Sequence, residues 1–171
     1  MKAYALTDVG RVRQMNQDYQ FSSTEPVGPL SNLFIVADGM GGHRAGDFAS
    51  RYLVEHLVSY IKECDDTGAV SAINNGIAKI NRELYEQSLT NAELAGMGTT
   101  LVAATIEDSI LYVANVGDSR LYLIEREGIS QITKDHSFVE EMVSMGQMAR
   151  DRSDYREKKI IITLAVGIGR K

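Results

Sequence analysis

Two long helical patterns follow one another directly in the middle of this 171-residue chain, between two groups of strand-like segments. Residues 46–63 and 69–89 repeat apolar side chains at steps of three and four, which is the period of an amphipathic helix lying on a core. Because strands and helices do not alternate along the chain, this order favours an α+β fold with an antiparallel sheet over a parallel fold.

The strand-like segments are short, rich in β-branched and aromatic residues, and separated by turn residues. They are residues 2–8, 18–23 and 33–37 before the helices, and 99–106, 110–116, 120–125 and 129–133 after them. Between two of the later strands, Gly117 and Asp118 are predicted to be the central residues of a tight hairpin turn. Further on, Ser137 is expected to cap a short helix, with Glu140 three residues later.

Composition restricts the class of protein. The formal charge of −5 and the absence of any run of Lys or Arg argue against nucleic acid as a partner. The single cysteine, Cys64, excludes a disulfide framework or a Cys-rich zinc site within one chain. Without an apolar stretch typical of a signal peptide or a membrane span, we expect a cytoplasmic protein with no membrane partner. No repeat or low-complexity linker divides the sequence, so residues 1–171 are expected to form one domain.

One apolar segment, residues 33–37, ends in a carboxylate followed by glycines. Asp38 comes directly after it, and Gly39, Gly41 and Gly42 would let the backbone turn sharply and approach a ligand closely. Two alternatives are a tight strand-to-helix turn with an incidental aspartate, and a nucleotide-binding P-loop. The P-loop is disfavoured because the segment lacks the Gly-Lys-Ser/Thr ending that binds a nucleotide and its magnesium.

Two further aspartates lie at the ends of predicted strands. Asp18 begins one and Asp118 follows another, and each taken alone is most simply a turn former or a solvated charge. Grouped with Asp38, they would make an all-oxygen site suited to Mg²⁺ or Mn²⁺. The spacing in the sequence does not establish that grouping.

Two other combinations of residues do not point to a site. Asp135, His136 and Ser137 are chain neighbours, which cannot reach the geometry of a Ser–His–Asp triad, so we interpret them as a helix cap. His43 and His56 have no companion ligand, which argues against zinc.

Five stretches together resemble a known family, the metal-dependent PPM or type 2C protein serine/threonine phosphatases in their bacterial form. They are TDVGRVRQMNQD (7–18), LFIVADGMGGHRAG (33–46), GMGTTLVAA (96–104), VANVGDSRLYLI (113–124) and ITKDHSFVEEMVSMG (132–146). They occur in the family's order and cover most of the chain. Several long motifs in the same order are a far more specific match than one glycine-rich loop.

The resemblance implies a central β-sandwich flanked by helices, in the order α-β-β-α, with two or more Mn²⁺ or Mg²⁺ ions in a cleft at one edge. It implies that Asp38 bridges two ions, that the Gly39 carbonyl binds one, and that Asp18 acts on the metal shell through water. Asp118 would belong to an additional metal position. Arg13 would bind the substrate phosphate, which a guanidinium fork suits better than an ammonium does.

The activity implied is hydrolysis of phosphoserine and phosphothreonine in proteins, by attack of a metal-activated water without a covalent phosphoenzyme. Phosphorylated proteins are the implied partners, together with a cognate serine/threonine kinase that shares these substrates. Met40 stands where the eukaryotic branch has a histidine that is a candidate general acid, and His43 is not its equivalent. Metal-bound water is therefore the expected proton donor.

The resemblance weakens near residue 171. Leu164 stands where the family usually has arginine, and two aspartates that ligate a metal further along are absent. Asp151 and Asp154, in the charged segment that corresponds to the family's flap, are not taken as replacement ligands. We therefore expect the C-terminal strands to be missing, one metal site to be weakened, and a dimer or strand exchange to be possible. The alternative function is a catalytically inactive regulatory or binding module with the same fold.

Overall fold

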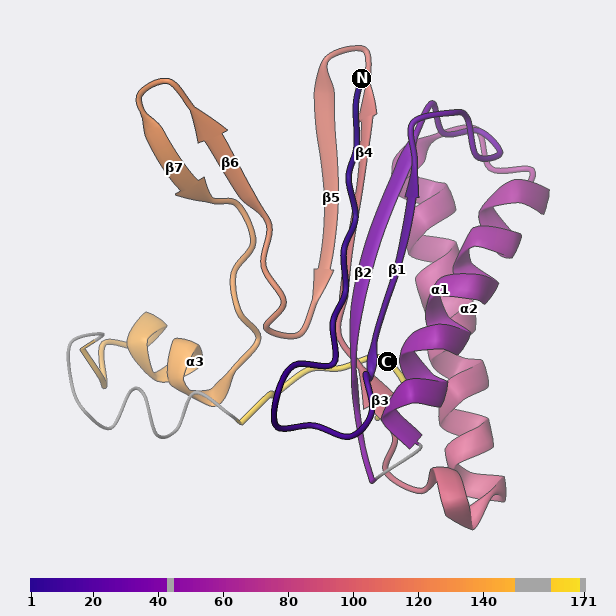
Figure 1. The fold of residues 1–171 in the computed structure, drawn as a ribbon, viewed down its shortest axis with the longest axis vertical. Coiled ribbons are helices and arrows are strands. Elements are labelled where there is room, and N and C mark those ends of the chain that lie inside the picture. Colours follow the sequence, from indigo (N-terminus) through magenta and orange to yellow (C-terminus); the bar gives the residue numbers. More distant parts are fainter. Residues whose placement is uncertain (43–44, 150–160, 170–171) are drawn as a thin grey trace.

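A computed structural model describes residues 1–42, 45–149 and 161–169 of the chain (Figure 1). His43, and the segment that contains Asp151 and Asp154, lie outside the described residues. In chain order the elements are β1 (Asp18–Ser23), β2 (Leu33–Met40), α1 (Ala45–Glu63), α2 (Ala69–Thr90), the 3₁₀ turn η1 (Ala92–Leu94), β3 (Gly98–Thr99), β4 (Leu101–Glu107), β5 (Ile110–Val116), β6 (Tyr122–Glu125), β7 (Gly128–Gln131) and α3 (Phe138–Ser144).

The main sheet is antiparallel, with strand order β1-β2-β4-β5, and β3 pairs with the end of β2. Strand β2 alternates along its length. Leu33, Ile35 and Ala37 are buried, while Val36 and Asp38 are exposed on the opposite face. This alternation follows from the two-residue period of a strand, and it places one face of β2 in the core.

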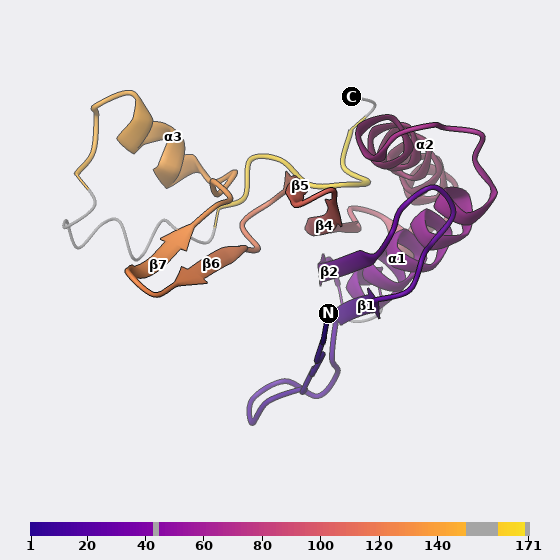
Figure 2. The same cartoon turned by 90° about the horizontal axis from the view of Figure 1, so that it is seen from above.

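Helices α1 and α2 cover the buried face of the sheet, and no helix of the described residues covers the other face (Figures 1 and 2). Their bounds agree with the two helices predicted from the apolar period. Leu53 and Leu57 of α1 and Leu84 of α2 are completely buried in the core that they form with the sheet. The predicted α+β class with an antiparallel sheet and flanking helices is confirmed.

A separate hairpin, β6–β7, extends away from the main sheet, and α3 follows it (Figure 1). Ser137 caps α3 as predicted, since its hydroxyl accepts a hydrogen bond from the Glu140 N–H (3.4 Å). Residues 161–169 return to the main body, where Val166 pairs with Thr99 through two backbone hydrogen bonds of 3.0 and 2.9 Å. Within the described part of the chain, no helix is both long and apolar enough to cross a membrane.

Three local predictions are wrong. Residues 2–8 are extended but belong to no strand, and Tyr4 and Leu6 are more than 90% exposed, because β-leaning composition does not supply a hydrogen-bonded partner strand. Gly117 and Asp118 do not form a hairpin turn, since β5 pairs with β4 whereas β6 pairs with β7. Strand β2 continues to Met40 instead of ending at Ala37, because β3 provides it with a further partner.

Candidate functional site

Asp18 and Asp38 face each other across the β1–β2 ladder. The antiparallel register makes them directly opposite partners. Side chains of such a pair lie on the same face, with Cβ atoms about 4.5–5.5 Å apart, and like charges at these positions destabilise a sheet. The face concerned is the one that α1 and α2 leave open, where Asp38 is exposed. The sheet therefore holds two carboxylates together at a cost in folding free energy.

Asp118 reaches the same region from the bend after β5. Gly117, at a φ of 100°, makes this bend, and His136 holds it on both sides. The Gly117 N–H donates to His136 Nδ1 (3.1 Å), and the His136 N–H donates to the Gly117 carbonyl (2.9 Å). As a result Asp118 lines the cleft that the two aspartates of the ladder also line.

The cleft has a volume of about 830 Å³ and is open to solvent. Its lining consists of Arg13, Met15, Asn16, Gln17, Asp18, Asp38, Gly39, Met40, Gly41, Asp118 and Ile162. All five residues predicted from the sequence to form the site are in this set. Segments far apart in the sequence thus contribute three carboxylates and one guanidinium to a single hollow.

The pKa of Asp38 is raised, in part by the negative charges near it. The pKa of Asp38 is about 6, well above its usual value. The largest cause is loss of hydration, followed by the charge of Asp18, a hydrogen bond between the two carboxyl groups, and the charge of Asp118. The Arg13 guanidinium acts in the opposite direction and lowers this pKa. The three acidic groups are therefore near enough to repel one another, and the charge of Arg13 offsets this repulsion only in part.

The donor set fits a hard divalent cation. Carboxylate, carbonyl and water oxygens are the ligands that Mg²⁺ and Mn²⁺ prefer, and a cation would offset the carboxylate repulsion that, after loss of hydration, contributes to the raised pKa of Asp38. Among the described residues, however, no group of three acidic, histidine or cysteine side chains forms a ready-made metal cage. A cation in this cleft would consequently need water or main-chain oxygen among its ligands.

The glycines around Asp38 serve backbone packing more than ligand approach. A Cβ at Gly39 would lie 1.9 Å from the Gly46 carbonyl oxygen, and a Cβ at Gly46 would lie 2.8 Å from the Gly39 oxygen. Strand β2 and the first turn of α1 therefore touch backbone to backbone. A Cβ at Gly42 would meet nothing within 4 Å, and Gly41 has a φ of 136°, so only Gly41 supports the predicted sharp turn.

The loop that carries Arg13 is tied to this crossing. The Gln17 carbonyl accepts hydrogen bonds from the Gly39 N–H (2.9 Å) and from the Ser50 hydroxyl of α1 (2.7 Å). Asn16 Oδ1 accepts from the Asp18 N–H (3.0 Å) at the start of β1. The end of the loop next to Asp18 is thus fixed by both β2 and α1.

Three residues that contribute to the site geometry were missed from the sequence. Thr100 and Ser119 share a hydrogen bond of 2.7 Å between their hydroxyl groups, and His136 holds Gly117. Spacing gives no signal for these contacts, because each joins segments 19 residues apart. The available indication was that each of the three residues lies in a different family-like stretch.

The three neighbours Asp135, His136 and Ser137 do not form a hydrolase triad, because each has a partner elsewhere in the structure. Asp135 is buried and pairs with Arg120 through bonds of 2.8 and 2.5 Å, while His136 Nδ1 accepts the Gly117 N–H. Ser137 caps α3. Each side chain of the sequence Asp135–Ser137 therefore has a structural partner elsewhere.

The chain is similar in sequence to known protein phosphatases. Residues 10–141 match the family described as Protein phosphatase 2C. A curated relative from Listeria monocytogenes serotype 4b (strain F2365), named Serine/threonine phosphatase stp, is 38% identical over 176 residues, covering 98% of this chain and 68% of the relative.

Solved structures agree with this. Serine/threonine phosphatase Stp1 from Staphylococcus aureus superposes with a TM-score of 0.85 at 37% identity, covering 97% of this chain and 66% of that one. The PPM Ser-Thr phosphatase MsPP from Mycobacterium smegmatis, solved in complex with cacodylate, gives 0.79 at 30% identity, covering 97% and 67%. The chain thus spans about two thirds of the length of these relatives.

Proposed function

This chain belongs to the protein phosphatase 2C family of serine/threonine phosphatases, and from that membership we propose how its own residues act on a phosphoester. The proposed reaction is hydrolysis of phosphoserine and phosphothreonine side chains in proteins. The observation that carries the proposal is the convergence of Asp18, Asp38 and Asp118 with Arg13 in one cleft.

We propose that these carboxylates hold Mn²⁺ or Mg²⁺. Asp38 would be the central ligand, assisted by the Gly39 carbonyl, with Asp18 acting through water and Asp118 at an additional position. When bound, such ions supply a water of lowered pKa and neutralise charge as the phosphoryl group is transferred. The raised pKa of Asp38 supports this assignment, because the charges of Asp18 and Asp118 contribute to it and a bound cation would offset their repulsion.

Arg13 is the proposed phosphate-binding residue. Its guanidinium lies near enough to Asp38 to lower the pKa of that carboxyl, so a phosphate bound by Arg13 would lie beside the carboxylates. A planar guanidinium can donate two parallel hydrogen bonds to two phosphate oxygens. The M. smegmatis relative was solved in complex with cacodylate, a tetrahedral oxyanion of a shape similar to phosphate.

Water is the proposed nucleophile and the proposed source of the leaving-group proton. No serine, threonine, cysteine or histidine is among the described residues that line the cleft, which favours direct attack by water over a phosphoenzyme formed on such a residue. Met40 lines the cleft where the eukaryotic branch has a histidine, so the described lining offers no imidazole as an acid.

The partners follow from the reaction. Phosphorylated proteins are the substrates that a protein phosphatase requires, and the open cleft is compatible with a side chain presented on a protein surface. A cognate kinase, a cytoplasmic location and self-association remain predictions from the sequence. The alternative of a non-catalytic binding module is less well supported, because the relatives compared above are named phosphatases.

The test is hydrolysis of a phosphothreonine peptide by the purified chain with and without Mn²⁺. We expect metal-dependent release of phosphate, which Asp38→Ala lowers at least about 100-fold, more than loss of an outer-shell contact would. Arg13→Lys should raise KM because an ammonium cannot make the paired contact. Asp65→Asn, in the loop between the helices, is the matched control and should behave as the unmodified chain.

Two results would count against the proposal. If the unmodified chain binds Mn²⁺ but hydrolyses the peptide no faster than Asp38→Ala does, at a negligible rate, the result would support the binding module. Metal-independent hydrolysis that survives Asp38→Ala would place the reaction elsewhere.

A further inference from the structure

The hydrogen-bond ladder of the sheet is interrupted opposite Asp38. Strands β3 and β4 are in the same register against β2, but Thr100, which lies between them, belongs to neither strand. Its N–H donates to the Asp38 carbonyl (2.9 Å), as in a regular ladder. The Asp38 N–H, however, donates to the Thr100 hydroxyl (2.9 Å) instead of to a carbonyl.

The same hydroxyl reaches a second segment of the site. Thr100 is completely buried, and its Oγ1 lies 2.7 Å from the hydroxyl oxygen of Ser119, the residue next to Asp118. The Thr100 methyl group packs on Gly117, where an added Cβ would lie 2.7 Å from Cγ2. Every polar and apolar part of this side chain therefore contacts a residue that carries or adjoins a site aspartate.

We propose that Thr100 is a positioning residue that fixes the separation of the Asp38 and Asp118 carboxylates. This rests on the proposed function, because a fixed separation matters only if both carboxylates serve one cation-containing site. The two aspartates are 80 positions apart in the sequence, and the Thr100 hydroxyl is bonded to the N–H of one and to the neighbour of the other.

A purely structural role is the competing explanation. A buried threonine hydroxyl that accepts one N–H satisfies a polar group and needs no further purpose. The bond to Ser119 separates the two explanations, since removal of the Ser119 hydroxyl leaves the Asp38–Thr100 bond intact. If positioning is the role, metal binding should respond to the loss of either hydroxyl.

The experiment measures Mn²⁺ affinity by calorimetry in the absence of substrate, for Thr100→Val, Thr100→Ser and Ser119→Ala. Valine keeps the shape but removes the hydroxyl, so Mn²⁺ affinity should fall about 10-fold to 100-fold, as for other contacts that orient metal ligands. Serine keeps the hydroxyl and should recover most of the affinity. Ser119→Ala should show a loss in the same direction as Thr100→Val.

Thr105→Val is the matched control. Thr105 is also completely buried, and its hydroxyl donates to the Asn32 carbonyl (2.7 Å) at the other end of β4. This variant should be destabilised without a change in Mn²⁺ affinity, which separates loss of a buried hydroxyl from loss of positioning.

The outcomes are distinct. Mn²⁺ affinity within twofold of the unmodified chain in Ser119→Ala and in folded Thr100→Val would overturn the positioning role while leaving the proposed function intact. If Thr100→Val does not fold, Ser119→Ala decides alone. An unmodified chain that neither binds Mn²⁺ nor releases phosphate would overturn the proposed function, and this inference with it.

Discussion

At the scale of single residues, the facing pair Asp18 and Asp38 is the most informative feature. A sheet selected for stability would not place two carboxylates directly opposite each other on one face. Their repulsion contributes to the raised pKa of Asp38, and Arg13 offsets only part of it. The arrangement makes physical sense if a cation occupies the cleft during function.

The pH dependence of stability in the metal-free protein tests this view. The pKa of Asp38 is raised to about 6, so between about pH 4 and pH 6 the folded state binds a proton more tightly than the unfolded chain. The contribution of Asp38 to stability therefore becomes less favourable as pH rises through this window. Asp38→Asn should unfold at higher urea concentration than the unmodified chain at pH 7.5, and the difference should shrink at pH 5.

The expected size is modest. A pKa shift of this size would correspond to roughly 3 kcal/mol for a buried group, but Asp38 is open to solvent, so we expect about 1 kcal/mol at pH 7.5. Chelator in all samples excludes metal effects, and Asp65→Asn controls for loss of a negative charge. A difference that does not grow between pH 5 and pH 7.5 would contradict the electrostatic explanation.

At the scale of elements, the crossing of β2 and α1 determines where the site residues lie. Gly39 and Gly46 allow the two backbones to touch, and the Gln17 carbonyl bonds to both elements. This contact holds Asp38 of β2 and the loop before Asp18 in one rigid corner.

Gly46→Ala should disturb that corner. Alanine in place of glycine favours a helix interior by about 1 kcal/mol, but here the added Cβ would lie 2.7 Å from Gln17 Nε2 and 2.8 Å from the Gly39 oxygen. The second contact is with backbone, so relief requires the helix to move. We expect a net loss of about 1–3 kcal/mol in the free energy of unfolding, measured with urea, and weaker Mn²⁺ binding.

Gly42→Ala provides the comparison, because its added Cβ would meet nothing within 4 Å. It should change the free energy of unfolding by less than Gly46→Ala does. If Gly46→Ala were as stable as the unmodified chain, the close backbone contact would not be needed for the fold.

The elements predicted well are those with a local signal. The period of three and four residues located α1 and α2 to within one residue at each end, because their buried faces are continuous. The prediction for residues 2–8 and for the Gly117 turn depended on which strands are neighbours, and that is a property of the whole sheet. The same limit applies to β2, whose last residues are strand only because β3 lies beside them.

The site was predictable in its residues but not in its geometry. Asp18, Asp38 and Asp118 stand out at strand ends, yet their grouping came from resemblance to a family and not from spacing. The direct opposition of Asp18 and Asp38 requires the ladder register, which no motif encodes locally. Thr100 and Ser119 carry no charge, and their roles arise only from tertiary hydrogen bonds.

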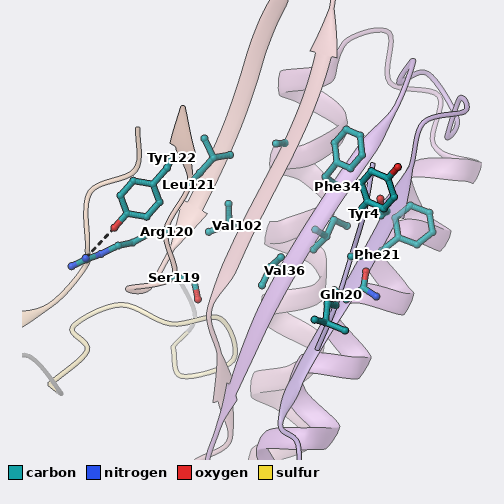
Figure 3. Close-up of a pocket in the computed structure, with 15 residues that line it drawn as sticks. Tyr4, Gln20, Phe21, Phe34, Val36, Val102, Ser119, Arg120, Leu121 and Tyr122 are labelled. Atoms are coloured by element: carbon teal, nitrogen blue, oxygen red, sulfur yellow. Dashed lines mark hydrogen bonds between the residues drawn. The ribbon is translucent and has the colours of Figure 1, made fainter. Parts of the chain in front are cut away.

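At the scale of the whole molecule, the two faces of the sheet differ. One is covered by α1 and α2, and the other forms an open cleft of about 570 Å³ with an apolar floor (Figure 3). Phe34, Val36 and Val102 contribute to that floor, Tyr4 lies over one side, and Tyr122 stands at the other. Val36, on the central strand β2, is 51% exposed. An apolar sheet face of this kind is a typical site of association.

We therefore expect the purified chain to self-associate through this face, a mode different from the dimer or strand exchange at unpaired strands that the sequence suggested. Sedimentation velocity over the micromolar range should show a weight-average coefficient that rises with concentration. Val36→Lys should reduce this rise, because association through this face would bury the added charge in an apolar contact. Val70→Lys, at an exposed position of α2, is the matched control and should associate as the unmodified chain does. A coefficient independent of concentration in the unmodified chain would contradict the prediction, and equal loss of association in both variants would assign the effect to net charge instead of to the open face.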